Sequence, residues 1–255
     1  MRWHFIGLML FTFLQDSSAG TDGSKLALSP MAGILEEASA CRRKEIPESL
    51  LVQNAPIVRG GIEVDSCLAL FPRLSLEPGY VLDFVYDYQG IGGHPILYAR
   101  LRDEASFSNL EEFRKRYPRE HFLGSPDRFD PFYLEKIHAD DTADGFLQLA
   151  MFVLTAEQFY VFSHALYSVV EPVLNSDTLL AICKVLPEQL RKQAAAIDFQ
   201  PRVDMGADAV CVEYVVFGEW IGFKRVSWTV HRVFPHKLLK VEEQLLLEHT
   251  NPIRF

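Results

Sequence analysis

The amino-acid sequence predicts an α+β fold, in which an antiparallel sheet with a C-terminal three-stranded meander is covered by a helical layer. Residues 80–88 place large apolar side chains at every second position, which is the period of a strand with one buried face. Helical segments fill the middle of the chain. The last sixty residues then change to three strand-like runs that are joined by Gly- and Pro-containing turns.

Residues 1–19 have the order of a secretory signal peptide. Arg2 precedes an apolar run from Phe5 to Leu14, and a short polar segment ends at Ala19. The apolar run is about half of the roughly twenty residues that a helix needs to span a bilayer. We therefore expect a cleaved leader and a secreted or periplasmic protein. The alternatives are a buried first helix of a cytosolic protein and a translation start at Met31.

The remaining chain, residues 20–255, is expected to form a single α+β domain, with a candidate seam in the polar segment 118–144. The whole sequence has 34 acidic and 25 basic side chains, giving a formal net charge of −9. This charge repels phosphate backbones, so nucleic acid is excluded as a partner. A protein, glycan or small-molecule partner remains, and no cofactor is expected because phosphate-binding glycine patterns are absent from the sequence.

Four cysteines follow the leader, and an oxidising compartment favours disulfides among them. Sequence alone leaves three connectivities open. The pairs Cys41–Cys67 and Cys183–Cys211 each close a loop of about 25 to 30 residues, worth roughly 3 kcal/mol in the chain-entropy model. The alternative is that some of them are small buried apolar residues, and Cys183 fits this in its apolar helical segment.

The segment 145–155 is almost continuously apolar, which predicts a strand buried on both faces. His164, in a predicted helix that follows this segment, is interpreted as a core histidine bonded to a neighbouring hydroxyl. The acidic run from His138 to Asp144 lacks the pattern of a calcium loop, so no metal site is expected. The predicted helices are residues 29–44, 111–117, 156–174, 177–186 and 187–196.

Strands are predicted at 80–88 and 95–101, joined by the glycine-rich connection 89–94. The aromatic side chains of the first strand should face the core. His94 precedes Pro95 and is therefore expected at the rim of the sheet. Together with Tyr86 and Tyr88, it could line a shallow ligand site, because loops at the edge of a rigid sheet often carry function.

The C-terminal meander is predicted at residues 209–217, 223–234 and 238–248, with a helix at 238–249 as the alternative for its last part. Trp220 and Ile221 lie at a glycine-bounded turn, where large apolar groups are costly to expose. They either fold back onto the sheet or mark a contact with a partner, a glycan or a membrane surface.

Cys67, the segment Leu76-Glu77-Pro78-Gly79 and the strand that opens with His94-Pro95 follow one another over about forty residues. This order resembles that of papain-like cell-wall amidases. The resemblance implies that the Cys67 thiolate attacks a peptide carbonyl and that His94 accepts the proton. The sequence departs from the pattern at Asp65-Ser66-Cys67, where the cysteine does not directly follow the acid, and at Pro72, which breaks the helix expected to carry the nucleophile.

The sequence therefore predicts an exported module of uncertain enzymatic status, whose leading function is non-catalytic binding of a partner or ligand. Its candidate binding residues are Tyr86, Tyr88, His94, Trp220 and Ile221. A secreted hydrolase using Cys67 and His94 is the main alternative. A third function, a carrier of lipids or small molecules, would use the aromatic face of strand 80–88.

Overall fold

The structure is a computed structural model that describes residues 28–42, 45–57, 61–117, 132–156, 158–163, 169–184 and 186–249. The predicted leader, the first half of the candidate seam and His164 lie outside the described residues. The described part has helices and antiparallel sheets, as an α+β fold requires.

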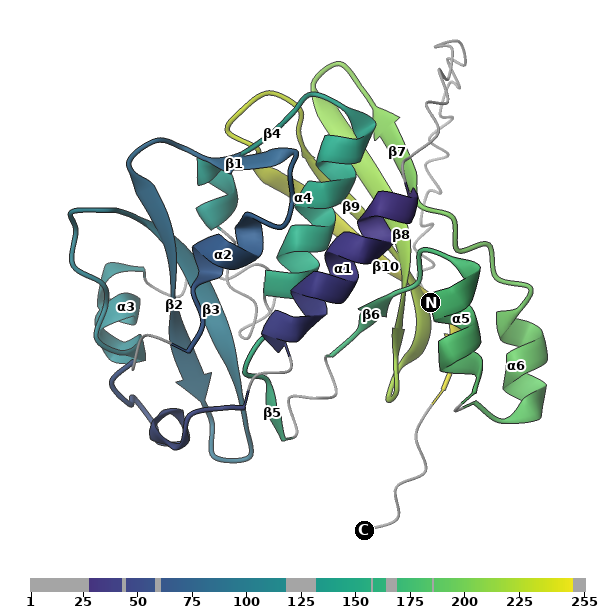
Figure 1. Ribbon diagram of the computed structural model, residues 1–255, viewed down its shortest axis with the longest axis horizontal. Coiled ribbons are helices and arrows are strands. Elements are labelled where there is room, and N and C mark those ends of the chain that lie inside the picture. Colours follow the sequence, from purple (N-terminus) through teal and green to yellow (C-terminus); the bar gives the residue numbers. More distant parts are fainter. Residues whose placement is uncertain are drawn as a thin grey trace, which may run out of the picture.

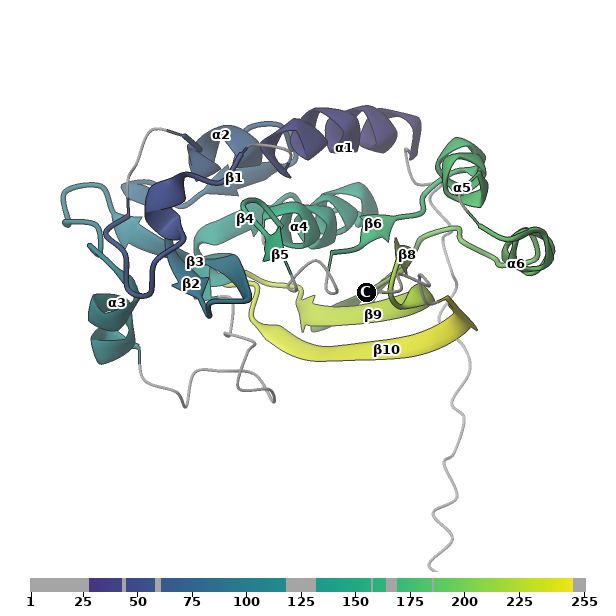
Figure 2. The same ribbon diagram turned by 90° about the horizontal axis from the view of Figure 1, so that it is seen from below.

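Helix α4 (Ala143–Ala156) lies at the centre of three layers. Figure 2 shows α1 (Leu28–Arg42) on one side of α4 and the C-terminal sheet on the other. Most side chains of α4 are buried, from Phe146 and Leu147 at its start to Phe152 near its end. A helix that is apolar all around is stable only with cover on every side. The predicted strand at 145–155 is therefore wrong, because the same apolar run forms this buried helix.

The C-terminal sheet has the strand order β10-β9-β8-β6, and β7 pairs with β8 beside β6. All neighbouring strands are antiparallel. The meander prediction is confirmed, and the alternative helix over residues 238–249 is wrong. The strands are β6 (Glu171–Pro172), β7 (Arg202–Met205), β8 (Ala209–Gly218), β9 (Gly222–His231) and β10 (Leu238–Glu248).

Each face of this sheet packs on a different group of helices. Val212 and Trp228 point to α4 and belong to the main core, which extends to Met31 in α1. Val215 and Phe217 point the other way and pack on α5 (Ser176–Cys183) and α6 (Glu188–Ala194). Figure 1 shows α5 and α6 together at one end of the molecule. The predicted helical layer is thus divided between the two faces.

A second sheet has the order β2-β3-β5. Its aromatic face, with Phe84 and Tyr86, joins the main core as predicted. The opposite face is also buried, because α3 packs Phe113 against Val85. The predicted helix 156–174 is wrong: it contains β5 and β6. The bounds are β2 (Tyr80–Tyr88), β3 (Gly92–Leu101), α3 (Leu110–Arg116) and β5 (Phe162–Ser163).

Short elements connect these layers. The β1–β4 pair lies beside the first turn of α4 and contributes to the main core. None of the helices in the described ranges is both long and apolar enough to cross a membrane. The short elements are η1 (Glu48–Leu50), α2 (Val64–Leu68), β1 (Leu74–Leu76), η3 (Phe132–Lys136) and β4 (Ile137–Ala139).

Candidate functional site

The structure does not bring Cys67 and His94 together. Cys67 is buried in α2, and the neighbouring Asp65 Oδ1 accepts a hydrogen bond of 2.7 Å from the Leu82 N–H of β2. His94 lies in β3 directly opposite Asp87. Leu82 and Asp87 are about 17 Å apart along the strand at roughly 3.4 Å per residue. The two candidates also lie on different sides of the sheet, because α2 packs in the main core whereas Asp87 faces α3.

His94 is therefore not at the rim of the sheet, as the sequence suggested. The turn is shorter than predicted, since β3 already begins at Gly92. Gln89 N–H donates to the Gly92 carbonyl at 2.8 Å and closes the hairpin. His94 becomes a half-buried strand residue beside Asp87.

Asp87 is already engaged by one cation, Arg114, and one neutral donor, Gln89. Its Oδ2 accepts hydrogen bonds from Arg114 Nη2 at 2.8 Å and from Gln89 Nε2 at 3.4 Å. Arg114 Nε is buried and makes no hydrogen bond to the described part of the chain. Because Arg114 neutralises Asp87, this face presents a paired carboxylate next to an imidazole instead of an unpaired general base.

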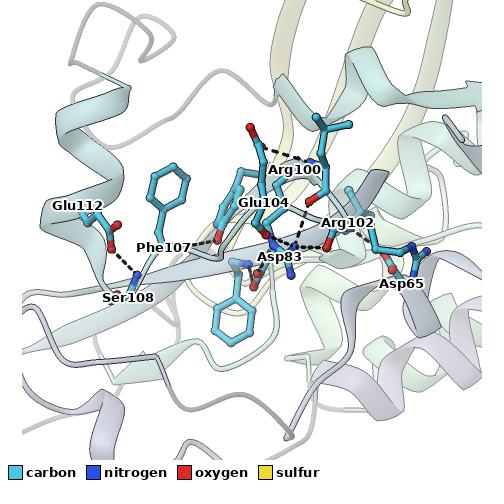
Figure 3. A network of polar contacts seen from close by, with 12 residues as sticks. Asp65, Asp83, Arg100, Arg102, Glu104, Phe107, Ser108 and Glu112 are labelled. Atoms are coloured by element: carbon cyan, nitrogen blue, oxygen red, sulfur yellow. Dashed lines mark hydrogen bonds and ion pairs between the residues drawn. The ribbon is translucent and has the colours of Figure 1, made fainter. Parts of the chain in front are cut away.

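Asp83, four residues earlier on the same face of strand β2, forms a second buried ion pair. Its Oδ2 accepts from Arg100 Nε at 3.0 Å, and its Oδ1 accepts from the Phe84 N–H at 2.9 Å. Figure 3 shows how Arg100 extends this pair into the loop before α3. Arg100 Nη1 donates to the carbonyls of Leu101 at 3.1 Å and Glu104 at 2.8 Å. The network holds the loop in place, which is a structural role.

The predicted binding residues are dispersed. Tyr86 faces the main core, where its hydroxyl donates to the Tyr160 carbonyl at 2.7 Å, so it does not join His94. Burial raises the pKa of Tyr86 well above its ordinary value. Tyr88 donates its hydroxyl to the Gly90 carbonyl at 2.9 Å. Trp220 and Ile221 are both half-buried at the β8–β9 turn, far along the chain from these tyrosines.

The described cysteines form no disulfide with one another. Cys183 at the end of α5 and Cys211 in β8 are free thiols, so the predicted Cys183–Cys211 pair is wrong. Cys211 lies opposite Thr229 on β9, whereas Cys183 packs among the apolar side chains below α5 and α6. The side chain of Cys41 lies outside the described residues, and its pairing with Cys67 stays a prediction.

The best-organised exposed feature is one that sequence reasoning missed: the segment 231–240, called here the β9–β10 corner, which comprises the last residue of β9, the connecting loop and the first three residues of β10. Figure 1 shows it beside β4 and the first turn of α4. The His231 N–H donates to the Lys237 carbonyl at 2.9 Å, which closes the loop. Val233 is 72 % exposed and Leu239 47 % exposed, so the corner presents two large aliphatic groups to solvent.

Polar contacts fix the corner to the rest of the fold. Arg232 binds Asp141 through two hydrogen bonds, Nε to Oδ1 at 2.7 Å and Nη2 to Oδ2 at 2.9 Å, and its Nη1 donates to the Gly206 carbonyl at 3.1 Å. The hydrogen bond from Arg232 lowers the pKa of Asp141. The ring of Phe234 stacks on His138, with centroids 3.6 Å apart and planes 12° from parallel.

His236 is the buried anchor of the corner. It is only 3 % exposed, and its ring meets Phe146 of α4 edge to face at 5.2 Å. Nδ1 lies 3.0 Å from the His231 carbonyl oxygen, and Nε2 lies 3.2 Å from the Ala139 backbone nitrogen. One imidazole therefore joins the corner to β4.

The acidic run after β4, residues 140–144, also fastens neighbouring parts of the fold to one another. Asp140 pairs with Arg73 at 2.6 Å, and Asp141 pairs with Arg232. Among the residues that the structure places, no group of three or more acidic, histidine or cysteine side chains is arranged to hold a metal ion. The run is explained by ion pairs that fasten neighbouring loops.

One signal in the sequence could have identified the corner. Residues 231–240 carry three cations and no carboxylate in a chain whose net charge is −9.

Comparisons of the chain with protein-family models, with curated proteins and with solved structures gave no match. The case for a function therefore depends on the geometry of this chain.

Proposed function

We propose that this protein is an exported, non-catalytic module that binds a partner protein through the β9–β10 corner. The observation that carries the proposal is the combination of exposed apolar groups with a rigid support. Val233 and Leu239 point to solvent, while Arg232, Phe234 and His236 fasten the same loop to the fold. A preorganised loop loses little conformational entropy when it binds, which favours affinity.

The chemistry of the corner indicates the surface that it recognises. Lys237 is an exposed cation, whereas Arg232 pairs with Asp141 and Lys240 pairs with Glu242, and Pro235 lies in the exposed surface between Val233 and Lys237. An apolar contact beside the Lys237 cation fits an apolar pocket that carries a carboxylate at its rim. We propose a protein of this kind as the partner. The basic segment has the opposite charge to the rest of this acidic chain, so the partner should approach in one orientation.

The hydrolase and carrier alternatives gain no geometric support. A nucleophile and its base must lie within hydrogen-bond reach of each other, and Cys67 and His94 are separated by the β2–β3 sheet. The aromatic face of β2 packs directly on the main core, with the Phe84 ring 5.0 Å from that of Phe159. Binding at the corner needs neither arrangement.

Site-specific photo-cross-linking tests the proposal. A photoreactive amino acid at position 233, in protein produced with its leader in its own host, should give one discrete protein adduct. The matched control is position 180, because Leu180 in α5 is similarly exposed, at 61 %. Equal adducts at both positions, no adduct at 233, or an adduct with lipid alone would contradict the proposal.

The identified partner is then purified and its affinity measured by calorimetry. Val233→Asp and Lys237→Glu should each weaken binding at least about tenfold, because they place a carboxylate against the apolar pocket and its acidic rim. Leu180→Asp should leave the affinity unchanged. If all three variants bind as the wild type does, the corner is not the binding surface.

The export part of the proposal rests on the leader-like order of residues 1–19. Intact-mass analysis of protein from an exporting host should give a chain that begins near Gly20. A chain recovered with Met1 in place and confined to the cytosol would contradict export without affecting the binding surface.

A further inference from the structure

The contacts of His236 define its protonation state. A backbone N–H can only donate, so the Nε2 atom that faces the Ala139 N–H must accept and carry no proton. The carbonyl of His231 can only accept, so Nδ1 must carry the proton and donate to it. The geometry therefore requires the neutral imidazole with its proton on Nδ1.

Adding a proton to His236 would break one of these contacts. The new Nε2–H would point at the Ala139 N–H, and two donors cannot form a hydrogen bond. The imidazolium would also be almost completely buried, and burial of a charge without a dedicated partner is costly. The Ala139 contact would be lost, and with it the direct hydrogen bond between the corner and β4.

The charged groups around His236 act in both directions. His138, on β4, lowers the pKa of His236, and Asp141 raises it. Asp141 is already engaged by both nitrogens of the Arg232 fork, which limits what it can offer His236. From α4, the contact is the apolar ring of Phe146. Burial is the largest influence, and it holds the pKa of His236 below its ordinary value.

We propose that His236 is an acid-sensitive latch, which holds the β9–β10 corner against β4 when neutral and loosens it when protonated, while the Phe234–His138 stack and the Arg232–Asp141 ion pair remain. The latch itself follows from the hydrogen-bond geometry. Its consequence, release of the partner protein in acid, rests on the function proposed above. An exported protein that meets an acidified environment would thereby lose one of the contacts that preorganise its binding surface.

The sign of the effect follows from the pKa shift. Because folding lowers the pKa of His236, the unlatched state binds the proton more tightly, and the latch is fully stable only above the ordinary histidine value. As pH falls below about 6.5, the equilibrium constant for opening should rise by up to about tenfold per pH unit. At neutral pH the latch should remain closed.

Nuclear magnetic resonance of the full chain tests the latch without the partner. At pH 7.5 the imidazole nitrogens of His236 should show the neutral form with its proton on Nδ1. The exchange protection of the Ala139 amide, corrected for intrinsic exchange, should fall between pH 7 and pH 5. The amide of Glu77 is the control, because it donates to the Lys136 carbonyl at 2.7 Å at the far end of the β1–β4 pair. A proton on Nε2 at neutral pH, or constant Ala139 protection, would overturn the latch.

Two variants assign the effect. His236→Gln keeps an acceptor and a donor but does not titrate, so its Ala139 protection should be independent of pH. His138→Gln removes the neighbouring histidine and should keep the fall in acid, which leaves the test intact if the first variant does not fold. If Ala139 protection still falls in acid in a folded His236→Gln variant, or no longer falls in His138→Gln, the assignment to His236 is contradicted.

Calorimetry with the purified partner, once photo-cross-linking has identified it, separates the latch proposal from the binding-surface proposal. If wild-type affinity falls about tenfold or more at pH 5 and His236→Gln keeps its affinity, both the latch and the binding surface are supported. If Ala139 protection falls while affinity stays constant, the latch stands and the binding surface is elsewhere. If affinity falls equally in wild type and His236→Gln, the latch does not control binding.

Discussion

Arg100→Met should destabilise the protein by about 3 kcal/mol, because it leaves Asp83 buried without its cation. The side chains of Arg100 and Asp83 are 20 % and 7 % exposed, so their pair is largely removed from water. Removing one partner of a buried pair costs roughly 3 to 5 kcal/mol, and the partial exposure of Arg100 places the expected loss at the lower end. The lost bonds to the loop carbonyls are replaced by water and add little.

Urea unfolding, followed by the fluorescence of the buried Trp228, measures this loss. The melting temperature should fall by about 9 °C, at roughly 3 °C per kcal/mol for a chain of this size. The matched control is Lys115→Met, since its ion pair with Glu111 is exposed and worth at most about 0.5 kcal/mol.

A double variant distinguishes a stranded charge from lost packing. Asp83→Asn combined with Arg100→Met removes both charges, and it should be at least about 1 kcal/mol more stable than Arg100→Met alone. If Arg100→Met costs less than about 1 kcal/mol, or the double variant shows no recovery, the buried-pair reasoning is refuted.

Three further predictions concern other parts of the molecule. Gly93→Ala should cost about 1 to 3 kcal/mol in urea unfolding, because its Cβ would lie 2.6 Å from the Tyr86 hydroxyl, whereas Gly33→Ala, in open space on α1, should stabilise by about 1 kcal/mol. Burial raises the pKa of Tyr86, so the folded state keeps its proton and stability should decline above about pH 10 in the wild type, with a smaller decline in Tyr86→Phe. Chain purified without reductant should have Cys183 and Cys211 both open to a thiol reagent on mass analysis, and protection of the two through a mutual disulfide would contradict the structure.

The strands of the C-terminal meander were predicted correctly because their information is local. Gly218 and Gly222 bound one turn and Pro235 lies in the next, and side chains of β8 and β9 alternate between a buried and a half-buried face over much of their length. The α5 and α6 helices were predicted for the same reason. Features of the sequence within a few residues were sufficient to predict these strands and helices, and tertiary contacts did not change them.

The continuous apolar run 145–155 was misassigned because it has no useful period. Burial on all sides removes the contrast between apolar and polar positions, so a buried helix and a buried strand look alike in sequence. What decides between them is the cover that α1 and the C-terminal sheet supply. For segment 156–174 the error was the reverse: a helix was predicted where the chain forms strands. The apolar positions fit a helical spacing, although the segment contains β5 and β6.

The sequence by itself determined the α+β class, the acidic charge, and the alternation that buries Phe84 and Tyr86. Only the tertiary structure decided which polar groups meet: it separated Cys67 from His94 and joined His236 to Ala139, 97 residues away along the chain. Periodicity records which side of an element is apolar. The partner of a hydrogen bond depends on where distant segments pack, and the packing of the core fixes that position.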